Sequence, residues 1–132
     1  MGFFVVTAGD QIEAMAHEFE KDNDDYNSIL VKAVGDRIAE ALAEYVHKHV
    51  RCIFGIQESL SREDMIAEKY RSIRPAPGYP ACPDHSEKGK IWKLLGVEEK
   101  IGVKLTENYA MTPPASVSGY YFMSPHAKYF AV

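Results

Sequence analysis

The residues best suited to chemistry lie in one proline-rich segment, residues 74–83, which reads RPAPGYPACP. Arg74 could clamp a carboxylate, because its planar guanidinium makes two parallel charge-assisted hydrogen bonds. Gly78 would let the backbone approach a ligand closely or adopt a positive φ, and the flanking prolines would limit the entropy lost on ordering. Two plainer interpretations stay open: a surface arginine paired with an acid, and a polyproline segment that serves as a linker or engages an aromatic groove.

Cysteine and histidine spacing gives little support for a metal centre. Cys82 and His85 form a CPDH sequence, but no second Cys/His pair stands at ligand spacing elsewhere. His47 and His49 lie two apart on an expected helix, so they point in different directions and we expect both to be solvated. We therefore expect no bound metal. We also expect free thiols at Cys52 and Cys82, because we find no export signal.

Length, composition and charge restrict the class of protein. A chain of 132 residues with 46% hydrophobic content predicts one domain with a modest core. The net charge of -4 offers no basic footprint, so we do not expect nucleic acid as a partner. The opening MGFFVVTAGD has only about five consecutive apolar residues, too few for a secretory or membrane segment, which predicts a cytoplasmic protein that makes no contact with membranes.

Hydrophobic periodicity predicts the first elements that must position the loop. Residues 3–7 are aromatic and β-branched, which predicts a strand. From 24 to about 51, apolar residues recur at three and four, with acids at the start and cations at the end, which predicts a long helix. A β-type run is expected at 52–56. A capping sequence at Ser61 predicts a short helix to about residue 70.

The second half begins with the loop at 74–83, where four prolines exclude both a helix and a central strand. A helix is expected over 86–96, with Ser86 as its cap and Gly96 as its stop. The remainder alternates short β-prone runs with turn residues, which favours antiparallel strands, including one over 129–132. The sequence therefore predicts an α+β fold, a twisted antiparallel β-sheet flanked by helices, with a ligand cleft between the proline-rich loop and the late strands.

Three blocks of the second half are more specific than composition: RPAPGYPACPDHSEK, GVKLTENYAMTPPASVSGYYF and HAKYFAV. In this order and at short spacing, they resemble the activation domain of cobalamin-dependent methionine synthases. Arg74, Gly78 and Tyr79 match the family's R-x-x-x-G-Y pattern, and DDYNSILVKAVGDRIAEALAEYVH is similar to its long helix. The resemblance covers nearly the whole chain. It implies a single activation domain over residues 1–132, truncated at both ends.

The resemblance also implies a function. Domains of this family bind S-adenosylmethionine, whose methyl group restores cobalamin that has slipped to the cob(II) state, while a flavodoxin-like donor supplies an electron. Cobalamin itself is held by a separate cobalamin-binding domain. The chain would then be part of a methyltransferase of methionine biosynthesis and would not turn over alone. No catalytic acid or base is expected, because the sulfonium is already an activated leaving group and the domain contributes positioning.

The resemblance assigns seven residues to the ligand, namely Arg74, Pro75, Ala76, Gly78, Tyr79, Tyr129 and Phe130. Arg74 is the expected carboxylate clamp. Tyr79 is expected near the reacting methyl group, where an aromatic face attracts a sulfonium. Phe130 stands where the family can carry a tyrosine, so only a main-chain contact is expected there. Tyr129 and Phe130 would otherwise be alternating strand residues, one buried and one exposed.

The carboxylate that would bind the ligand's ammonium is a further expectation. In the family this acid lies upstream of the first residue here, which leaves Asp84 and Glu87 as the candidates nearest to Arg74 in the sequence. Glu68 aligns with a region that faces the cobalamin domain, but a single helix glutamate is usually a solvated charge.

Two rival hypotheses come from other classes of protein. The chain could be a truncated docking or structural fragment that contacts the cobalamin domain or flavodoxin without useful ligand affinity. It could also be a stand-alone α+β module whose proline-rich loop engages a partner protein. Only the activation-domain hypothesis predicts that replacing Arg74 abolishes nucleoside binding while the fold stays intact.

Overall fold

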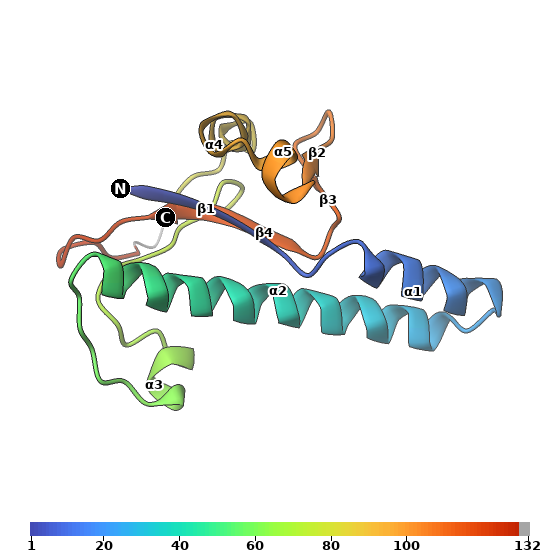
Figure 1. Cartoon of the computed structure of the whole chain (residues 1–132), viewed down its shortest axis with the longest axis horizontal. Helices are drawn as coiled ribbons and strands as arrows, with labels where there is room; N and C mark the ends of the chain where they lie inside the picture. The colour runs from blue at the N-terminus through green and yellow to red at the C-terminus, as the bar shows by residue number, and fades with distance from the viewer. Residues whose placement is uncertain (130–132) are drawn as a thin grey trace.

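A computed structural model describes residues 1–129 and places helices on both sides of a small antiparallel sheet (Figure 1). Its elements, in chain order, are β1 (Gly2–Thr7), α1 (Gln11–Lys21), α2 (Asp25–Ile53), α3 (Arg62–Ile66), α4 (Glu87–Leu95), α5 (Val97–Ile101), β2 (Lys104–Leu105), β3 (Met111–Thr112) and β4 (Ser116–Tyr121). The expected α+β class is confirmed. Within these residues, every helix is too short or too polar to cross a bilayer.

The sheet that organises the fold pairs a strand at the start of the chain with one from its last quarter. β1 and β4 pair antiparallel, from Gly2 opposite Tyr121 to Thr7 opposite Ser116, as the predicted strand at 3–7 requires. Because successive strand residues point to opposite faces, this two-stranded sheet supports two cores. The core on the α2 face consists of Phe4, Val6, Ala43 and Tyr121, and the core on the opposite face consists of Ile91, Trp92, Val97 and Val103. Figure 1 shows α2 along one face, with α4 and α5 over the other.

Helix α2 confirms the long helix predicted from the periodicity, but it ends two residues later than expected. Asp24 caps the helix by accepting a hydrogen bond from Asn27 N at 3.0 Å. The β-type run expected at 52–56 is wrong, since Cys52 and Ile53 continue the helix. Arg51 explains why: it is 2% exposed, lies 3.9 Å from the centre of the Tyr70 ring and pairs with Glu58 at 3.2 Å. These tertiary contacts fix the last helical turn and override the local β propensity.

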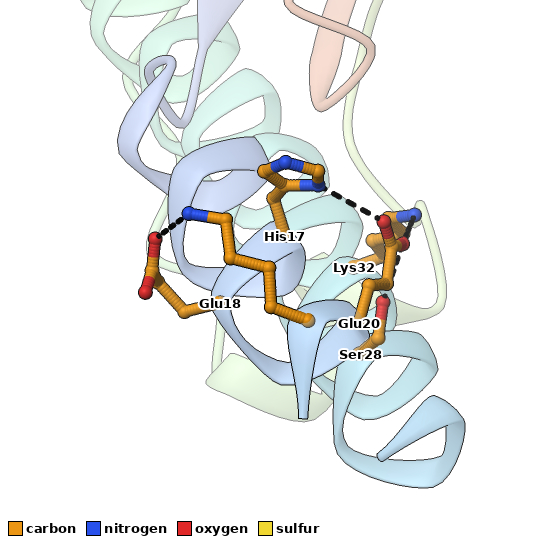
Figure 2. Close-up of polar contacts among 6 residues, drawn as sticks. His17, Glu18, Glu20, Ser28 and Lys32 are labelled. Atoms are coloured by element: carbon orange, nitrogen blue, oxygen red, sulfur yellow. Dashed lines mark hydrogen bonds and ion pairs between the residues drawn. The ribbon is translucent and has the colours of Figure 1, made fainter. Parts of the chain in front are cut away.

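Helix α1 was not expected from the sequence. It packs against the start of α2 through Glu20, which accepts hydrogen bonds from Lys32 Nζ at 2.8 Å and Ser28 Oγ at 2.9 Å (Figure 2). Lys32 and then Ser28, with help from His17, lower the pKa of Glu20 to about 2. Ala16 is fully buried between the two helices and the rest of the chain. Ile12, Ala16 and Phe19 recur at three and four and form the less exposed face of α1. That spacing was the available sequence signal for this helix.

The second half matches its predicted elements closely. Ser61 Oγ accepts a hydrogen bond from Asp64 N at 3.0 Å and so caps α3, although this helix ends at Ile66, short of the expected residue 70. The expected helix at 86–96 is α4, which ends at Gly96 in the left-handed conformation. The expected side-chain cap by Ser86 is wrong: Ser86 has helical φ and ψ and its hydroxyl makes no cap hydrogen bond. The β2–β3 hairpin and β4 confirm the antiparallel strands. Tyr129 lies outside any strand, and residues 130–132 lie outside the described part of the chain.

Candidate functional site

A cavity of about 390 Å³ lies where the ligand cleft was expected, between the loop at 74–83 and β4, with α2 closing one side. It is lined by Phe4, Glu40, Glu68, Arg74, Pro75, Ala76, Tyr79, Pro80, Ala81, Val117, Ser118 and Tyr129. A cavity of this volume, with apolar walls and a few charged groups, is typical of a small-molecule site.

The start of the loop is seated on the outer edge of β4. Pro75 O accepts a hydrogen bond from Tyr120 N at 2.9 Å, and Ile73 and Phe122 exchange two main-chain hydrogen bonds at 3.0 and 3.2 Å. Gly119 makes this approach possible, because a Cβ there would lie 2.7 Å from Pro75 O. The strand therefore fixes Pro75, and with it the main chain of its neighbours in the cavity wall.

The tip of the loop is a tight turn. Gly78 has a φ of 99°, as expected for a position that favours glycine. Its N–H donates to Cys82 O at 2.7 Å, and Cys82 N donates to Tyr79 O at 2.8 Å. The His85 ring occupies the space where a Cβ of residue 78 would stand. The turn presents Tyr79 at the cavity rim with 65% of its surface exposed.

Arg74 sits among carboxylates on the inner side of the cavity. Its Nη2 lies 3.3 Å from Glu44 Oε2 and 3.7 Å from Glu68 Oε1, and its Nη1 lies 3.9 Å from Glu40 Oε2. Only 16% of the Arg74 side chain is exposed. Burial alone would lower the pKa of Arg74, but Tyr70 and the carboxylates outweigh it and raise the pKa. The plainer interpretation of Arg74 as a surface arginine paired with an acid is therefore half right. Arg74 does pair with acids, but its side chain is largely buried.

The acids beside Arg74 are not the two that were expected. Asp84 accepts a hydrogen bond from Ser86 N at 2.8 Å and Glu87 pairs with Lys90 at 2.6 Å, and neither lines the cavity. The carboxylates that reach Arg74 come from α2 and from the residues after α3. Glu40 and Glu44 are four residues apart, so both lie on the same face of α2. That spacing was the available signal.

The late segment supplies one expected residue. Tyr129 lines the cavity, and its hydroxyl oxygen accepts a hydrogen bond from Arg74 N at 3.1 Å. Burial raises the pKa of this hydroxyl. Arg74, Pro75, Ala76, Tyr79 and Tyr129 thus meet at one cavity, and Gly78 shapes the loop. Phe130, the seventh expected residue, lies outside the described residues.

His47 corrects another expectation. It is fully buried rather than solvated, with Nε2 2.6 Å from Ser72 Oγ and its ring stacked on Tyr121 at 5.0 Å. Burial, and then the positive charges of Arg51 and Arg74, lower its pKa to about 3. His47 is therefore neutral near pH 7, in the core between α2 and the sheet. Within residues 1–129, no three His, Cys, Asp or Glu side chains group as metal ligands.

Comparison with known proteins agrees with this arrangement. Residues 1–132 match the family model described as vitamin B12 dependent methionine synthase, activation domain. A crystal structure of the MetH reactivation domain bound to AdoHcy is similar, with a TM-score of 0.94 and 55% sequence identity over 98% of the present chain. The chain spans 41% of the length of that protein chain. The similarity confirms the fold that the sequence blocks implied.

Proposed function

Because this chain belongs to the family of vitamin B12 dependent methionine synthase activation domains, we propose that its cavity binds S-adenosylmethionine and that the domain supports the reductive remethylation of cobalamin. The similar MetH reactivation domain carries AdoHcy, the demethylated form of this ligand. The proposal places the chain within methionine synthase, a methyltransferase, and in the cytoplasm. It extends to a cobalamin-binding domain and a flavodoxin-like electron donor as partners.

The observation that carries the proposal is the charge pattern of the cavity. S-adenosylmethionine has a carboxylate at one end, an ammonium and a sulfonium beside it, and a neutral adenosyl group. The cavity offers one guanidinium, Arg74, within 3.9 Å of the carboxylates of Glu40, Glu44 and Glu68. A zwitterionic ligand finds a partner of opposite sign for each of its charges in this arrangement.

The Nη1 atom of Arg74 is better placed than Nη2 to bind a ligand carboxylate. Nη2 already lies close to Glu44, whereas Nη1 makes the longest of the three contacts, to Glu40. A carboxylate on Nη1 would free Glu40, which lines the cavity, to accept hydrogen bonds from the ligand's ammonium. Glu68 lines the same cavity and is the second available acid. The two charged ends of the ligand's amino acid would then be held side by side.

The rest of the cavity suits the neutral half of the ligand. Pro75, Ala76, Pro80 and Ala81 form an apolar wall beside the aromatic rings of two tyrosines. Tyr79 lies at the exposed rim, where a reacting partner would approach. Its π face attracts a sulfonium by about 0.5 to 2 kcal/mol. The domain's own contribution is to hold and orient the methyl donor, which lowers the entropic barrier to transfer.

Cobalamin belongs to a separate domain in this proposal. When bound there, and after one electron has been supplied, it provides the nucleophile that takes the methyl group from sulfur and leaves S-adenosylhomocysteine. The residues of the present chain need move no proton in that step. This agrees with the cavity lining, which contains no histidine or lysine within residues 1–129.

Isothermal titration calorimetry of S-adenosylmethionine into the 132-residue chain tests the proposal. We expect saturable binding that falls at least about tenfold in Arg74→Ala, since a charge-assisted contact is lost. Arg71→Ala is the matched control, because Arg71 is exposed and lies outside the cavity lining. Circular dichroism establishes that each variant is folded. A folded wild type that does not bind would reject the proposal and favour a docking or structural fragment.

A further inference from the structure

The outer edge of β4 has a gap in its hydrogen bonding that faces the cavity. β4 pairs with β1 through alternate residues, as antiparallel strands do. The hydrogen bond from Ala8 N to Ala115 O at 2.8 Å sets the phase of this pairing. With the register known, the main-chain groups of Ser116, Ser118 and Tyr120 point away from β1.

Two of these three residues have partners on that edge. Ser116 N donates to Pro114 O at 2.6 Å, and Tyr120 N donates to Pro75 O at 2.9 Å. Ser118 stands between them and lines the cavity. Among residues 1–129, the structure gives no main-chain partner on this edge for its N–H or its C=O.

The sequence of the loop explains the gap. Ile73 pairs with Phe122, and Pro75 reaches Tyr120, so the same antiparallel register would place Pro77 opposite Ser118. Proline has no N–H to donate to a strand. The loop leaves β4 after Pro75 and enters the tight turn at Gly78. Ser118 is 3% exposed and borders the cavity.

We propose that the main chain of Ser118 binds the adenine of the S-adenosyl ligand by a two-point hydrogen bond. This inference rests on the proposed function and names the part of the site that recognises the base. The N–H and C=O of one extended residue lie side by side and fit a flat group with an adjacent acceptor and donor. Adenine presents such an edge, with N7 as acceptor and the 6-amino group as donor.

The neighbouring groups favour the base over the charged end of the ligand. The carboxylate and ammonium have charged partners in Arg74 and the glutamates, whereas the strand edge is neutral. Phe4 and Ala76 line the cavity beside Ser118 and give the flat ring apolar contacts. A peptide strand is disfavoured, because the N–H groups of Ser116 and Tyr120 already have partners and only that of Ser118 is left to donate to a ladder.

The test compares Ser118→Pro with Ser118→Ala by calorimetry of S-adenosylhomocysteine. Proline removes the N–H and is tolerated on an edge strand where that N–H points outward, whereas alanine keeps the N–H and removes only the hydroxyl. Ser118→Ala is therefore the reference for the proline variant, because the two differ in the main-chain N–H. We expect Ser118→Pro to bind about tenfold more weakly than Ser118→Ala, as for the loss of one hydrogen bond.

A second ligand keeps the inference testable if Ser118→Pro does not fold. S-inosylhomocysteine replaces the 6-amino donor by a carbonyl acceptor, so it should bind the wild type at least about tenfold more weakly than the adenosyl compound. Equal affinity of the wild type for both ligands, or an unchanged affinity in folded Ser118→Pro, would overturn the role of Ser118 alone. A folded wild type that binds neither ligand would overturn the proposed function as well.

Discussion

Replacing Gly119 by alanine is expected to damage both the sheet and the ligand cavity. A Cβ at this position would lie 2.7 Å from Pro75 O and 2.9 Å from Phe4 Cε1. Neither neighbour can move freely. Pro75 O is bonded to Tyr120 N, and Phe4 is 5% exposed and stacked on Tyr121 at 4.7 Å. The added methyl group must therefore push the loop away from β4 or displace a ring of the core.

The size of the effect follows from these two neighbours. Forcing one extra methyl group into a packed core costs about 1 to 3 kcal/mol. For a chain of this length, 1 kcal/mol corresponds to roughly 4 °C in Tm, so the variant should melt several degrees below the wild type. If the loop moves, the hydrogen bond between Tyr120 N and Pro75 O is lost and Arg74 shifts with it. Ligand affinity should then fall by about tenfold or more.

Urea and thermal unfolding followed by circular dichroism, together with calorimetry of S-adenosylmethionine, measure both effects. Gly89→Ala is the matched control, because a Cβ there meets only Tyr109 Cε1 at an ordinary 3.5 Å. Gly89 lies within α4, where alanine is the better helix former by about 1 kcal/mol. The control should therefore be as stable as the wild type or more so. If Gly119→Ala keeps the wild-type Tm and affinity, the loop does not sit on β4 as described.

Two further variants test the cores on either side of the sheet. Folded His47 takes up a proton only near pH 3, whereas the unfolded chain does so near 6.5, so the free energy of unfolding should decrease as the pH drops from 6.5 toward 3. His47 contributes at most about 1.4 kcal/mol per pH unit to that slope. Urea unfolding at several pH values should show this contribution missing in His47→Gln. Equal slopes in the variant and the wild type would contradict the burial of His47. Trp92→Phe loses the hydrogen bond from Trp92 Nε1 to Val103 O at 2.8 Å and should cost about 1 to 3 kcal/mol in urea unfolding. Its ligand affinity should stay unchanged, since Trp92 does not line the cavity, and an affinity loss equal to that of Arg74→Ala would refute the separation of the two cores.

Local signals predicted the elements that do not depend on distant contacts. The three-and-four spacing and the acids at its start predicted α2, because an amphipathic helix is specified by nearby residues. Proline excluded regular structure from the loop, and Gly96 marked the end of α4. The blocks resembling activation domains predicted the cavity-lining loop residues, including Arg74 and Tyr79.

The remaining features depend on contacts between distant parts of the chain. The end of α2 is fixed by Arg51 contacts with Glu58 and Tyr70, which no periodicity reveals. The carboxylates beside Arg74 were missed because Glu40 and Glu44 looked like members of a solvated helix face. Their pairing with Arg74 spans at least 30 residues of sequence. Single-residue patterns predict which side chains are polar, but not which of them meet.

The carboxylates around Arg74 also bear on what happens after the methyl group has left. Three glutamates and one arginine give the cluster a formal charge of -2. In the proposed function, S-adenosylmethionine enters with a net charge of +1 from its sulfonium, ammonium and carboxylate, whereas S-adenosylhomocysteine is neutral overall. The charge of the protein stays the same while the ligand loses the positive charge of its sulfonium, so the electrostatic attraction between them weakens during the reaction itself. The same side chains that attract the methyl donor thereby favour exchange of the spent ligand for a fresh one.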